Sequence, residues 1–330
     1  MLSTNTIRKD IFNINNDKQL NKISLQIFNY QLTHNIVYQT YIKELNINTS
    51  KIKHYKDIPF LPIDFFKTHK IISPNKKPET IFRSSGTSGM TRSEHHIADL
   101  SVYEKSFLQT FKLFYGKPED YIFLALLPSY SEQDSSSLIY MVEKLMQISN
   151  NPDNGFYLYN HSQLNDKLSE LEKQNRKTIL FGVSFALIDF FENYYINLKN
   201  TIIIETGGMK GRKKEIVREE LHKIIKKATG LKHIHSEYGM TELLSQAYAK
   251  EENKYANPPW MKILIRDAND PFSFLPKRQS GGINIIDLAN IYSCSFIETK
   301  DLGKLHPDNT FEILGRFDNS DIRGCNLMVV

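Results

Sequence analysis

The stretch that decides the fold class covers residues 178–205, TILFGVSFALIDFFENYYINLKNTIIIE. Two short apolar runs, at 178–183 and 201–205, stand on either side of a segment with helical character. Apolar runs of this length predict buried strands, and a helix between two strands is the usual connection in a parallel pair. The stretch therefore predicts a strand, a helix and a second strand parallel to the first.

The same alternation continues outward from this unit. Further strands are predicted at 121–127 and 232–237, with amphipathic segments between the strands. Apolar residues at helical spacing predict helix over residues 17–45, and the proline-punctuated segment 58–62 is expected to be extended. Alternating strands and helices favour an α/β fold with a mostly parallel sheet covered by helices.

The pattern changes after residue 281, where the predicted strands follow one another closely. They are expected at 282–288, 295–298 and 311–314, with turns at 301–303 and 306–309 between them. This end of the chain predicts a small β-rich subdomain. No repeat, low-complexity tract or change of composition marks a linker.

The composition bears on the class of partner. The chain has 330 residues, 40% of them hydrophobic, which is enough for a large domain with a well-buried core. The net charge of +5 is spread along the chain, and the basic segment 210–227 also carries an apolar helical face. Nucleic-acid binding is therefore not expected, and a small molecule is the expected partner.

Cysteine usage and apolar runs bear on the compartment. The two cysteines, Cys294 and Cys325, are too few for a disulfide framework or a zinc site, which is typical of a reducing compartment. The first residues lack the apolar core of a signal peptide, and the longest apolar runs fall short of the roughly 18 to 20 residues that a membrane span needs. We therefore expect a cytoplasmic protein without a membrane span.

A run of small residues follows the apolar segment 81–82. It consists of Ser84, Ser85, Gly86, Thr87, Ser88 and Gly89. The glycines permit close approach of the backbone, and the N–H and hydroxyl groups are donors suited to a phosphate. The same residue types also build ordinary surface turns, so the loop alone is consistent with either. It matches neither G-x-x-x-x-G-K-[ST] nor G-x-G-x-x-G, which excludes the common P-loop and the dinucleotide-binding turn.

Two predicted strands end in polar and glycine residues. Gly207 and Gly208 follow the first, and Tyr238, Thr241 and Glu242 follow the second, at the start of an expected helix. A tyrosine can stack on a base, a threonine at a helix N-terminus can bind a phosphate oxygen, and a carboxylate can hold a magnesium ion. Open α/β sheets bind their ligands at this edge, so these residues are candidates for one site.

Two further candidates lie at expected turns in the β-rich end. Asp301 is suited to accept hydrogen bonds from ribose hydroxyls, and Arg316 is suited to meet a phosphate. Residues 182–186 also resemble the G-x-S-x-G nucleophile elbow of hydrolases, but the last glycine is missing. We therefore interpret Ser184 as a helix cap.

Together these segments resemble the core motifs of the adenylate-forming superfamily, which includes acyl- and aryl-CoA ligases and peptide-synthetase adenylation domains. The matching motifs are S-S-G-T-S-G at 84–89, Y-G-M-T-E at 238–242, T-x-D-L at 299–302 and G-R-x-D at 315–318. Their order and spacing make the set more specific than any single motif. The resemblance covers roughly residues 55–328.

Within the superfamily, the last two motifs and I-R-G-C-N at 322–326 are most similar to the phenylacetate–CoA ligase branch. The segments L-P-I-D-F-F at 61–66 and T-G-G at 206–208, with the Ser/Gly loop, resemble LuxE-type acyl-protein synthetases. These enzymes activate fatty acids for bacterial fatty-acid reductase. The resemblance implies the fold of the large N-terminal domain of an adenylate-forming enzyme, with ATP and Mg²⁺ as cofactors.

The resemblance also implies a role for each matching residue. The loop from Ser84 to Gly89 would surround the β- and γ-phosphates of ATP, and Thr241 would touch the α-phosphate. Gly207 and Gly208 with Tyr238 would form the adenine pocket, and Glu242 would bind Mg²⁺. Asp301 would accept hydrogen bonds from the ribose hydroxyls, and Arg316 would contact ribose or phosphate. The pocket for the acid is expected to include residues 128–130 and 181–185 with Tyr238.

The chain departs from the superfamily pattern at its C-terminal end. Relatives continue into a mobile domain with an adenylation lysine, and this sequence stops at Val330. We expect residues 1–316 to form the adenylate-forming domain, with a helical region at 1–55. Residues 317–330 are expected to be a hinge remnant and a cysteine tail, without the mobile domain.

Cys325 is a candidate carrier of the activated acyl group, as in LuxE-type proteins. It stands beside Arg323, and a neighbouring cation favours the nucleophilic thiolate. The alternative is a small buried hydrophobic residue in a last strand. We keep both interpretations.

The expected activity is ATP-dependent activation of a carboxylic acid, a fatty acid in the leading hypothesis, to an acyl-adenylate. The acyl group would then pass to Cys325 and to a partner protein. An acyl- or aryl-CoA ligase, or a carrier-protein ligase, is the nearest alternative. A non-catalytic subunit that binds nucleotide or acyl groups within a complex is a different class, and the sequence leaves it open.

Overall fold

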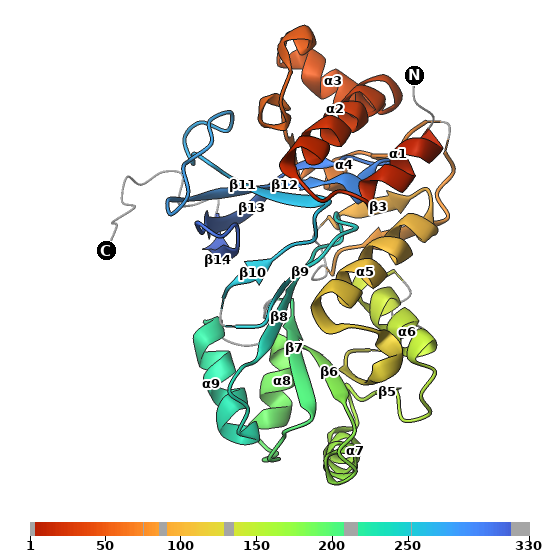
Figure 1. Cartoon of the computed structure of the whole chain (residues 1–330), viewed down its shortest axis with the longest axis vertical. Helices are drawn as coiled ribbons and strands as arrows, with labels where there is room; N and C mark the ends of the chain where they lie inside the picture. The colour runs from red at the N-terminus through yellow and green to blue at the C-terminus, as the bar shows by residue number, and fades with distance from the viewer. Residues whose placement is uncertain are drawn as a thin grey trace.

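The computed structural model describes residues 4–74, 76–85, 91–128, 135–207, 217–251 and 253–317. Within these residues the chain forms a twelve-stranded sheet and a separate two-stranded one (Figure 1). Helices lie against the sheet, as the alternating sequence pattern predicts.

One half of the large sheet is parallel. It runs in the order β8 (His235–Tyr238), β7 (Thr201–Thr206), β6 (Thr178–Val183), β4 (Ile122–Leu126) and β5 (Gly155–Phe156). The predicted strand at 178–183 matches β6 at both ends, and α8 (Ser184–Phe191) connects it to β7. The strand–helix–strand unit predicted from 178–205 is therefore confirmed.

Alternate residues of the parallel strands pack into two separate cores. In β4, Phe123 and Ala125 join the core formed with α5 (Leu100–Tyr115) and α6 (Ser137–Ser149). The other residues of β4, including Leu124, join the core formed with α7 (His161–Lys173), α8 and α9 (Arg218–Thr229). Because successive side chains of a strand point to opposite faces, a strand covered on both faces must be apolar throughout, as β4 is.

The other half of the large sheet is mostly antiparallel. Its strands follow β8 in the order β9 (Ala247–Ala249), β10 (Tyr255–Ala256), β14 (Phe311–Arg316), β13 (Phe296–Leu305), β12 (Ser280–Asp287) and β11 (Met261–Arg266). The short strand β1 (Leu61–Pro62) pairs parallel with β13. The predicted β-rich end of the chain is therefore joined to the parallel half through β9 and β10.

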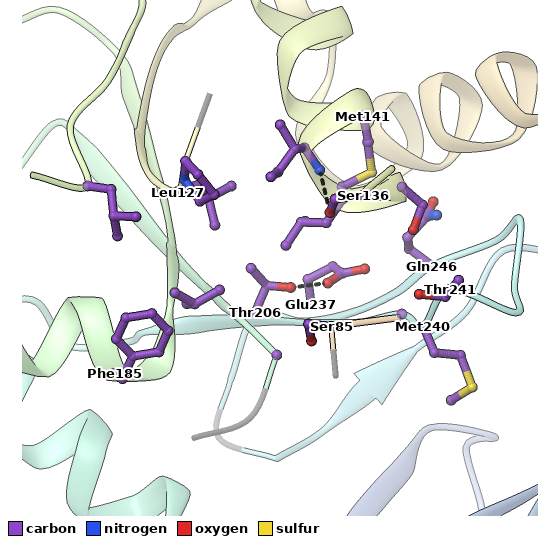
Figure 2. A pocket seen from close by; sticks show the side chains of 18 of the residues that line it. Ser85, Leu127, Ser136, Met141, Phe185, Thr206, Glu237, Met240, Thr241 and Gln246 are labelled. Atoms are coloured by element: carbon purple, nitrogen blue, oxygen red, sulfur yellow. Dashed lines mark hydrogen bonds between the residues drawn. The ribbon is translucent and has the colours of Figure 1, made fainter. Parts of the chain in front are cut away.

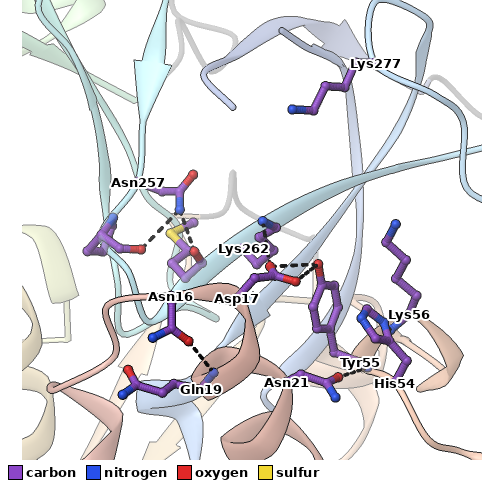
Figure 3. Close-up of polar contacts among 12 residues, drawn as sticks. Asn16, Asp17, Gln19, Asn21, His54, Tyr55, Lys56, Asn257, Lys262 and Lys277 are labelled. Carbon is purple, nitrogen blue, oxygen red and sulfur yellow. Dashed lines mark hydrogen bonds and ion pairs between the residues drawn. The ribbon is translucent and has the colours of Figure 1, made fainter. Parts of the chain in front are cut away.

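The N-terminal region contributes α1 (Thr4–Ile11), α2 (Asp17–His34) and α3 (Ile36–Glu44), which lie near β11 to β13 (Figure 1). The Asp17 carboxylate accepts from Tyr55 Oη at 3.1 Å and lies 3.4 Å from Lys262 Nζ of β11 (Figure 3). The buried Gln31 amide donates to the Asn290 carbonyl at 2.9 Å. These long-range contacts fix the helical region on the sheet.

Three local predictions are wrong. No turn lies at 301–303, because those residues belong to β13; a Cβ on Gly303 would stand 2.5 Å from the Glu312 carbonyl oxygen, so the glycine permits close strand approach instead. No helix follows Tyr238, because the chain turns there and continues into β9. Ser184 is the first helical residue of α8 rather than its cap.

In the part of the chain that the structure describes, no helix combines the length and the apolar character that a membrane crossing requires.

Candidate functional site

The carboxyl ends of β6, β7 and β8 meet at one edge of the sheet. Val183 pairs with Thr206, and Thr206 pairs with Glu237, so the residues that follow each strand converge. A cavity of about 660 Å³ opens at this edge, within the size range of ligand pockets. Among the predicted site residues, its lining includes Ser84, Gly207, Tyr238, Thr241, Glu242, Asp301 and Arg316.

The remaining predicted site residues fall into two groups. Ser85 lines a second, adjoining cavity. Gly86, Thr87, Ser88, Gly89, Gly208 and Cys325 lie outside the described residues. The lining of the larger cavity thus combines predicted site residues that stand up to 232 positions apart, from Ser84 to Arg316.

The Ser/Gly loop connects the strands of a hairpin, β2 (Thr80–Arg83) and β3 (Glu94–Ile97). Its base is closed by two hydrogen bonds: Ser84 N–H donates to the Ser93 carbonyl at 3.1 Å, and Ser93 N–H donates to Ser84 Oγ at 2.9 Å. Ser84 and Ser93 both line the 660 Å³ cavity. The hairpin thus holds both ends of the loop at the cavity wall.

Tyr238, Asp301 and Arg316 form a connected polar group. Tyr238 Oη donates to Asp301 Oδ2 at 2.7 Å, and Arg316 Nε lies 3.3 Å from Asp301 Oδ1. Burial raises the pKa of Tyr238 well above its ordinary value, and the neighbouring Asp301 adds to the effect. Tyr238 is therefore a neutral donor that fixes the carboxylate of Asp301 at the cavity wall.

Glu242 and Thr241 are held by long-range contacts rather than by a helix. The Asp287 carboxylate accepts from the N–H groups of Leu244 and Ser245, and His95 Nδ1 lies 2.8 Å from the Thr241 carbonyl. Burial lowers the pKa of His95 to about 4, so the ring is neutral at pH 7 and donates to that carbonyl. These bonds occupy backbone groups that a helix would need.

The donor set suits a magnesium ion held mainly by phosphate. Glu242 is 6% exposed and lines the cavity, and its carbonyl accepts from Asn290 Nδ2 at 2.8 Å. Among the described residues, no group of three or more histidine, cysteine, aspartate or glutamate side chains forms a ready metal site. Mg²⁺ commonly uses one or two carboxylates plus substrate phosphates and water, so a single carboxylate at this position fits the ion.

Sequence analysis missed a pair of lysines at the cavity wall. Lys300 Nζ lies 2.6 Å from Asp64 Oδ2, and Lys67 Nζ lies 2.8 Å from Asp64 Oδ1. Burial alone would raise the pKa of Asp64, but the hydrogen bonds from Lys300 and Lys67 lower it below its ordinary value. All three side chains line the cavity, although Asp64 and Lys300 are far apart in the sequence.

Ser184 is a structural donor rather than a nucleophile. Its Oγ lies 2.8 Å from Glu205 Oε1 and 2.6 Å from the Gly207 carbonyl, so acceptors surround the hydroxyl. Burial would raise the pKa of Glu205, but His222, Arg218 and Ser184 lower it. A carboxylate whose pKa is lowered is a weak base for a serine hydroxyl, so the Ser184–Glu205 pair differs from the serine–histidine pair that activates a nucleophile.

A second cavity, of about 360 Å³, adjoins the first (Figure 2). Its lining includes the apolar side chains of Leu127, Leu138, Ile139, Met141, Val183 and Phe185. Five residues line both cavities: Gly207, Glu237, Gly239, Met240 and Thr241. Of the predicted acid-pocket residues, Pro128, Val183 and Phe185 line this cavity, while Phe181 is buried in the core and 129–130 lie outside the described residues.

Glu237 is a buried carboxyl that the sequence did not single out. It accepts a hydrogen bond from Thr206 Oγ1 and belongs to the wall that the two cavities share. Burial raises its pKa from 4.5 to about 7, a shift that the Thr206 hydrogen bond partly offsets and that Glu205 increases. The buried group is thus partly protonated near neutral pH.

We expect Glu237→Gln to change how stability depends on pH. Between about pH 4.5 and 7 the folded chain retains a proton that the unfolded chain releases, so stability falls as pH rises through this window. The variant cannot ionise, so its stability relative to the parent should increase across the window by up to about 3 kcal/mol and then level off. Urea unfolding at half-unit steps from pH 4 to 8.5 measures this, with Glu119→Gln, on the surface, as control. A difference that stays constant with pH would contradict the prediction.

The comparisons with known proteins concern the fold. No protein-family model and no curated protein matches the sequence. Among solved structures, ATP-bound MatB from Rhodopseudomonas palustris matches with a TM-score of 0.55 and 17% identity, over 72% of this chain and 47% of MatB. An open conformation of 2-hydroxyisobutyryl-CoA ligase in complex with 2-HIB-AMP and CoA matches with a TM-score of 0.65 and 14% identity, over 92% of this chain and 70% of the ligase.

Amide bond synthetase McbA from Marinactinospora thermotolerans matches with a TM-score of 0.52 and 15% identity, over 72% of this chain and 48% of McbA. The chain spans about half the length of MatB and of McbA. Identities at this level establish the fold alone. The chain therefore has the α/β fold of the large domain of adenylate-forming enzymes.

Proposed function

We propose that the chain activates a carboxylic acid with ATP. A carboxylate oxygen attacks the α-phosphorus, the bond from that phosphorus to the pyrophosphate oxygen breaks, and an acyl-adenylate and pyrophosphate form. The observation that carries this proposal is the wall that the two cavities share: the larger is of nucleotide size and is lined by Ser84, Asp301 and Arg316, and the smaller is lined in part by Leu127, Met141 and Phe185. An acid in the second cavity meets a nucleotide in the first at Gly239, Met240 and Thr241.

The residues of the larger cavity suit the parts of ATP. Ser84 and the following loop would bind the β- and γ-phosphates, and Thr241 would face the α-phosphate. Gly207 and Gly208 with Tyr238 would form the adenine pocket. Asp301 would accept hydrogen bonds from the ribose hydroxyls, and Arg316 would contact ribose or phosphate. Mg²⁺ on Glu242 would offset phosphate charge when bound. Preorganised donors and cations of this kind stabilise charge that develops during the attack.

For the acid and the acceptor we propose the LuxE-type reaction, in which a fatty acid is activated and passed to a thiol. The apolar side chains in the mixed lining of the 360 Å³ cavity, among them Leu127, Leu138 and Phe185, support an acyl chain. In the second step the thiolate of Cys325 attacks the acyl carbonyl carbon, AMP leaves, and the acyl group is held as a thioester before transfer to a partner protein. The thiol proton is released before the attack.

Transfer to coenzyme A or to the thiol of a carrier protein is the second candidate. The ligase that matches over 92% of this chain was solved with 2-HIB-AMP and CoA, which favours an external thiol as acceptor. The two candidates share the adenylation step and differ only in whether Cys325 is needed. A third, a nucleotide- or acyl-binding subunit without turnover, remains as an outcome of the experiment below.

Pyrophosphate exchange and intact-protein mass spectrometry test these steps separately. We expect exchange of labelled pyrophosphate into ATP that requires Mg²⁺ and a fatty acid, and a hydroxylamine-sensitive acyl adduct on the chain. Cys325→Ala should keep the exchange and lose the adduct. Cys294→Ala is the matched control, because Cys294 is fully buried and burial raises the pKa of its thiol to about 12.

Each alternative predicts a different result in the same assays. Exchange without an adduct, with acyl-CoA formed when CoA is added, would favour the external acceptor. Nucleotide binding without exchange for any fatty or aromatic acid would refute the adenylation step and favour the non-catalytic subunit.

A further inference from the structure

The wall that the two cavities share contains a carboxyl group with one open oxygen. Glu237 lines both cavities, and its Oε2 atom accepts a hydrogen bond from Thr206 Oγ1 (Figure 2). Its Oε1 atom has no hydrogen-bond partner among the described residues, and it is not one of the unpartnered polar atoms that are closed to solvent. Oε1 is therefore accessible to a ligand.

Gly239 makes room for this oxygen. A Cβ atom on Gly239 would collide with Glu237 Oε1, so the carboxyl group occupies the space of a side chain that the glycine lacks. Gly239 lines both cavities as well. Oε1 thus lies beside the residue at which, under the proposed function, the acid meets the nucleotide.

The hydrogen bond from Thr206 determines which oxygen of a neutral Glu237 carries the proton. A protonated carboxyl has one O–H group, and Oε2 already acts as an acceptor, so the proton belongs on Oε1. An ionised Glu237 would instead place a second negative charge beside the carboxylate of the acid. Because charges repel strongly in a buried site, the neutral form is the one that suits a carboxylate.

The surroundings of Glu237 favour this neutral form. Among the described residues no cation pairs with Glu237, and the Arg218 guanidinium lies 3.5 Å from the Glu205 carboxylate instead. Glu205 is ionised, because its neighbours lower its pKa, and its charge disfavours a second carboxylate. Burial raises the pKa of each tyrosine nearby, so these side chains are uncharged. The titratable groups that interact with Glu237 are Glu205 in β7, Tyr103 and Tyr115 in α5, Tyr248 in β9 and Tyr255 in β10.

We propose that Glu237 donates a hydrogen bond from Oε1 to the carboxylate of the acid and so positions that group for attack on the nucleotide. One carboxylate oxygen accepts this bond, and the other faces the α-phosphorus. The proton stays on Glu237, so binding of the acid takes up a proton whenever Glu237 is ionised in the free chain. This inference rests on the proposed function, which gives the direction in which the acid lies.

Calorimetric titration at several pH values measures this coupling directly. The full chain is titrated with straight-chain carboxylates of four to ten carbons, in pairs of buffers that differ in their heat of ionisation. We expect little proton uptake at pH 6 and close to one proton per bound acid at pH 8.5, because Glu237 in the free chain loses its proton at about pH 7. The dissociation constant should rise about 30-fold over the same range.

Glu237→Gln separates the hydrogen bond from the titration. Its amide oxygen can accept from Thr206, and its amide nitrogen can donate at the position of Oε1. The dissociation constant of this variant should stay within about threefold from pH 6 to 8.5, without proton uptake. Glu237→Met has no donor and should bind at least about tenfold more weakly than the parent at pH 6. Glu119→Gln, on the surface, should behave like the parent.

Other donors at the wall predict a different result. The hydroxyl groups of Ser136, Ser137 and Thr241 also line the smaller cavity and can bond to the acid, but hydroxyls of this kind do not titrate between pH 6 and 8.5. Among the described residues, no histidine lines either cavity. Binding by the parent that does not depend on pH would overturn the proposal, as would proton uptake that persists in Glu237→Gln or no binding of any acid.

Binding and turnover are measured separately. Proton-coupled binding that Glu237→Gln abolishes, without pyrophosphate exchange in the parent, would support this inference and count against the proposed function. Exchange together with acid binding that does not depend on pH would support the proposed function and overturn this inference.

Discussion

Asp287→Ala is expected to reduce the free energy of unfolding by about 3–5 kcal/mol, the largest loss of stability that we predict for a single side chain. The Asp287 carboxylate is fully buried and accepts from the N–H groups of Leu244, Ser245 and Ala289 at 2.7, 2.9 and 3.2 Å, and from Ser245 Oγ at 2.6 Å. Alanine would leave these donors buried without the acceptor. Urea unfolding at pH 7 measures the change.

Asp270→Ala is the control for this variant. Asp270 makes similar local bonds, to the Phe272 N–H at 3.0 Å and to Ser273 Oγ at 2.5 Å, but in an exposed turn where water replaces the carboxylate. We expect a change within about 0.5 kcal/mol there. If Asp287→Ala also stays within about 1 kcal/mol of the parent, the segment after Tyr238 is held by something other than this carboxylate.

Asp287 also affects the geometry of the candidate site, because its partner Ser245 belongs to a larger hydrogen-bond network. Trp260 Nε1 lies 3.1 Å from Ser245 Oγ and 3.0 Å from Ser106 Oγ, which joins the segment after β8 to α5. Thr241 and Glu242 sit only a few residues before Ser245. Their positions at the cavity wall therefore depend on a carboxylate at the far end of β12.

This dependence explains why the sequence predicted the parallel half of the fold well and the segment after Tyr238 poorly. The apolar run at 178–183 is a local signal, and β6 has the same bounds because its burial on both faces demands that run. The conformation of residues 239–246 is set by Asp287, more than 40 positions away. A tertiary hydrogen bond of this kind leaves no local pattern that distinguishes a turn from a helix start.

The candidate site shows the same division. Motifs located Tyr238, Thr241, Glu242, Asp301 and Arg316, and the structure places all of them around one cavity. The site residues that the sequence analysis missed can be recognised only through their contacts with residues that are distant in sequence. Lys300 of β13 pairs with Asp64, which follows β1, and Glu237 accepts a hydrogen bond from Thr206 of β7.

Gly303 illustrates a signal that was present and misinterpreted. An aspartate and a glycine two residues apart are typical of a turn, and the sequence prediction placed one at 301–303. In the structure the glycine stands inside β13, opposite Ile313, where the chain has an irregular register. Only the packing of β12 and β14 against that position distinguishes a glycine inside a strand from a glycine in a turn.

Asp301→Ala is expected to lower kcat/KM for ATP in pyrophosphate exchange about 100-fold, because hydrogen bonds to a charged group are worth about 1.5–3 kcal/mol. The carboxylate is 8% exposed, receives the Tyr238 hydroxyl at 2.7 Å and faces the ligand cavity. The direct measure of its role is the ratio of kcat/KM for ATP to that for 2′,3′-dideoxy-ATP. The parent should prefer ATP about 100-fold, and Asp301→Ala should show almost no preference.

Two further variants separate binding of the ribose from a structural effect. Tyr238→Phe keeps the carboxylate but removes the donor that orients it, so it should lose activity toward ATP while retaining part of the preference over the dideoxy analogue. Asp308→Ala removes an exposed aspartate from the neighbouring turn, where it pairs with Lys254 at 3.0 Å, and should leave both quantities unchanged. A folded Asp301→Ala variant that keeps the full preference for ATP would show that the ribose hydroxyls bind elsewhere, and the assignment of this cavity to the nucleotide would then lose its most specific contact.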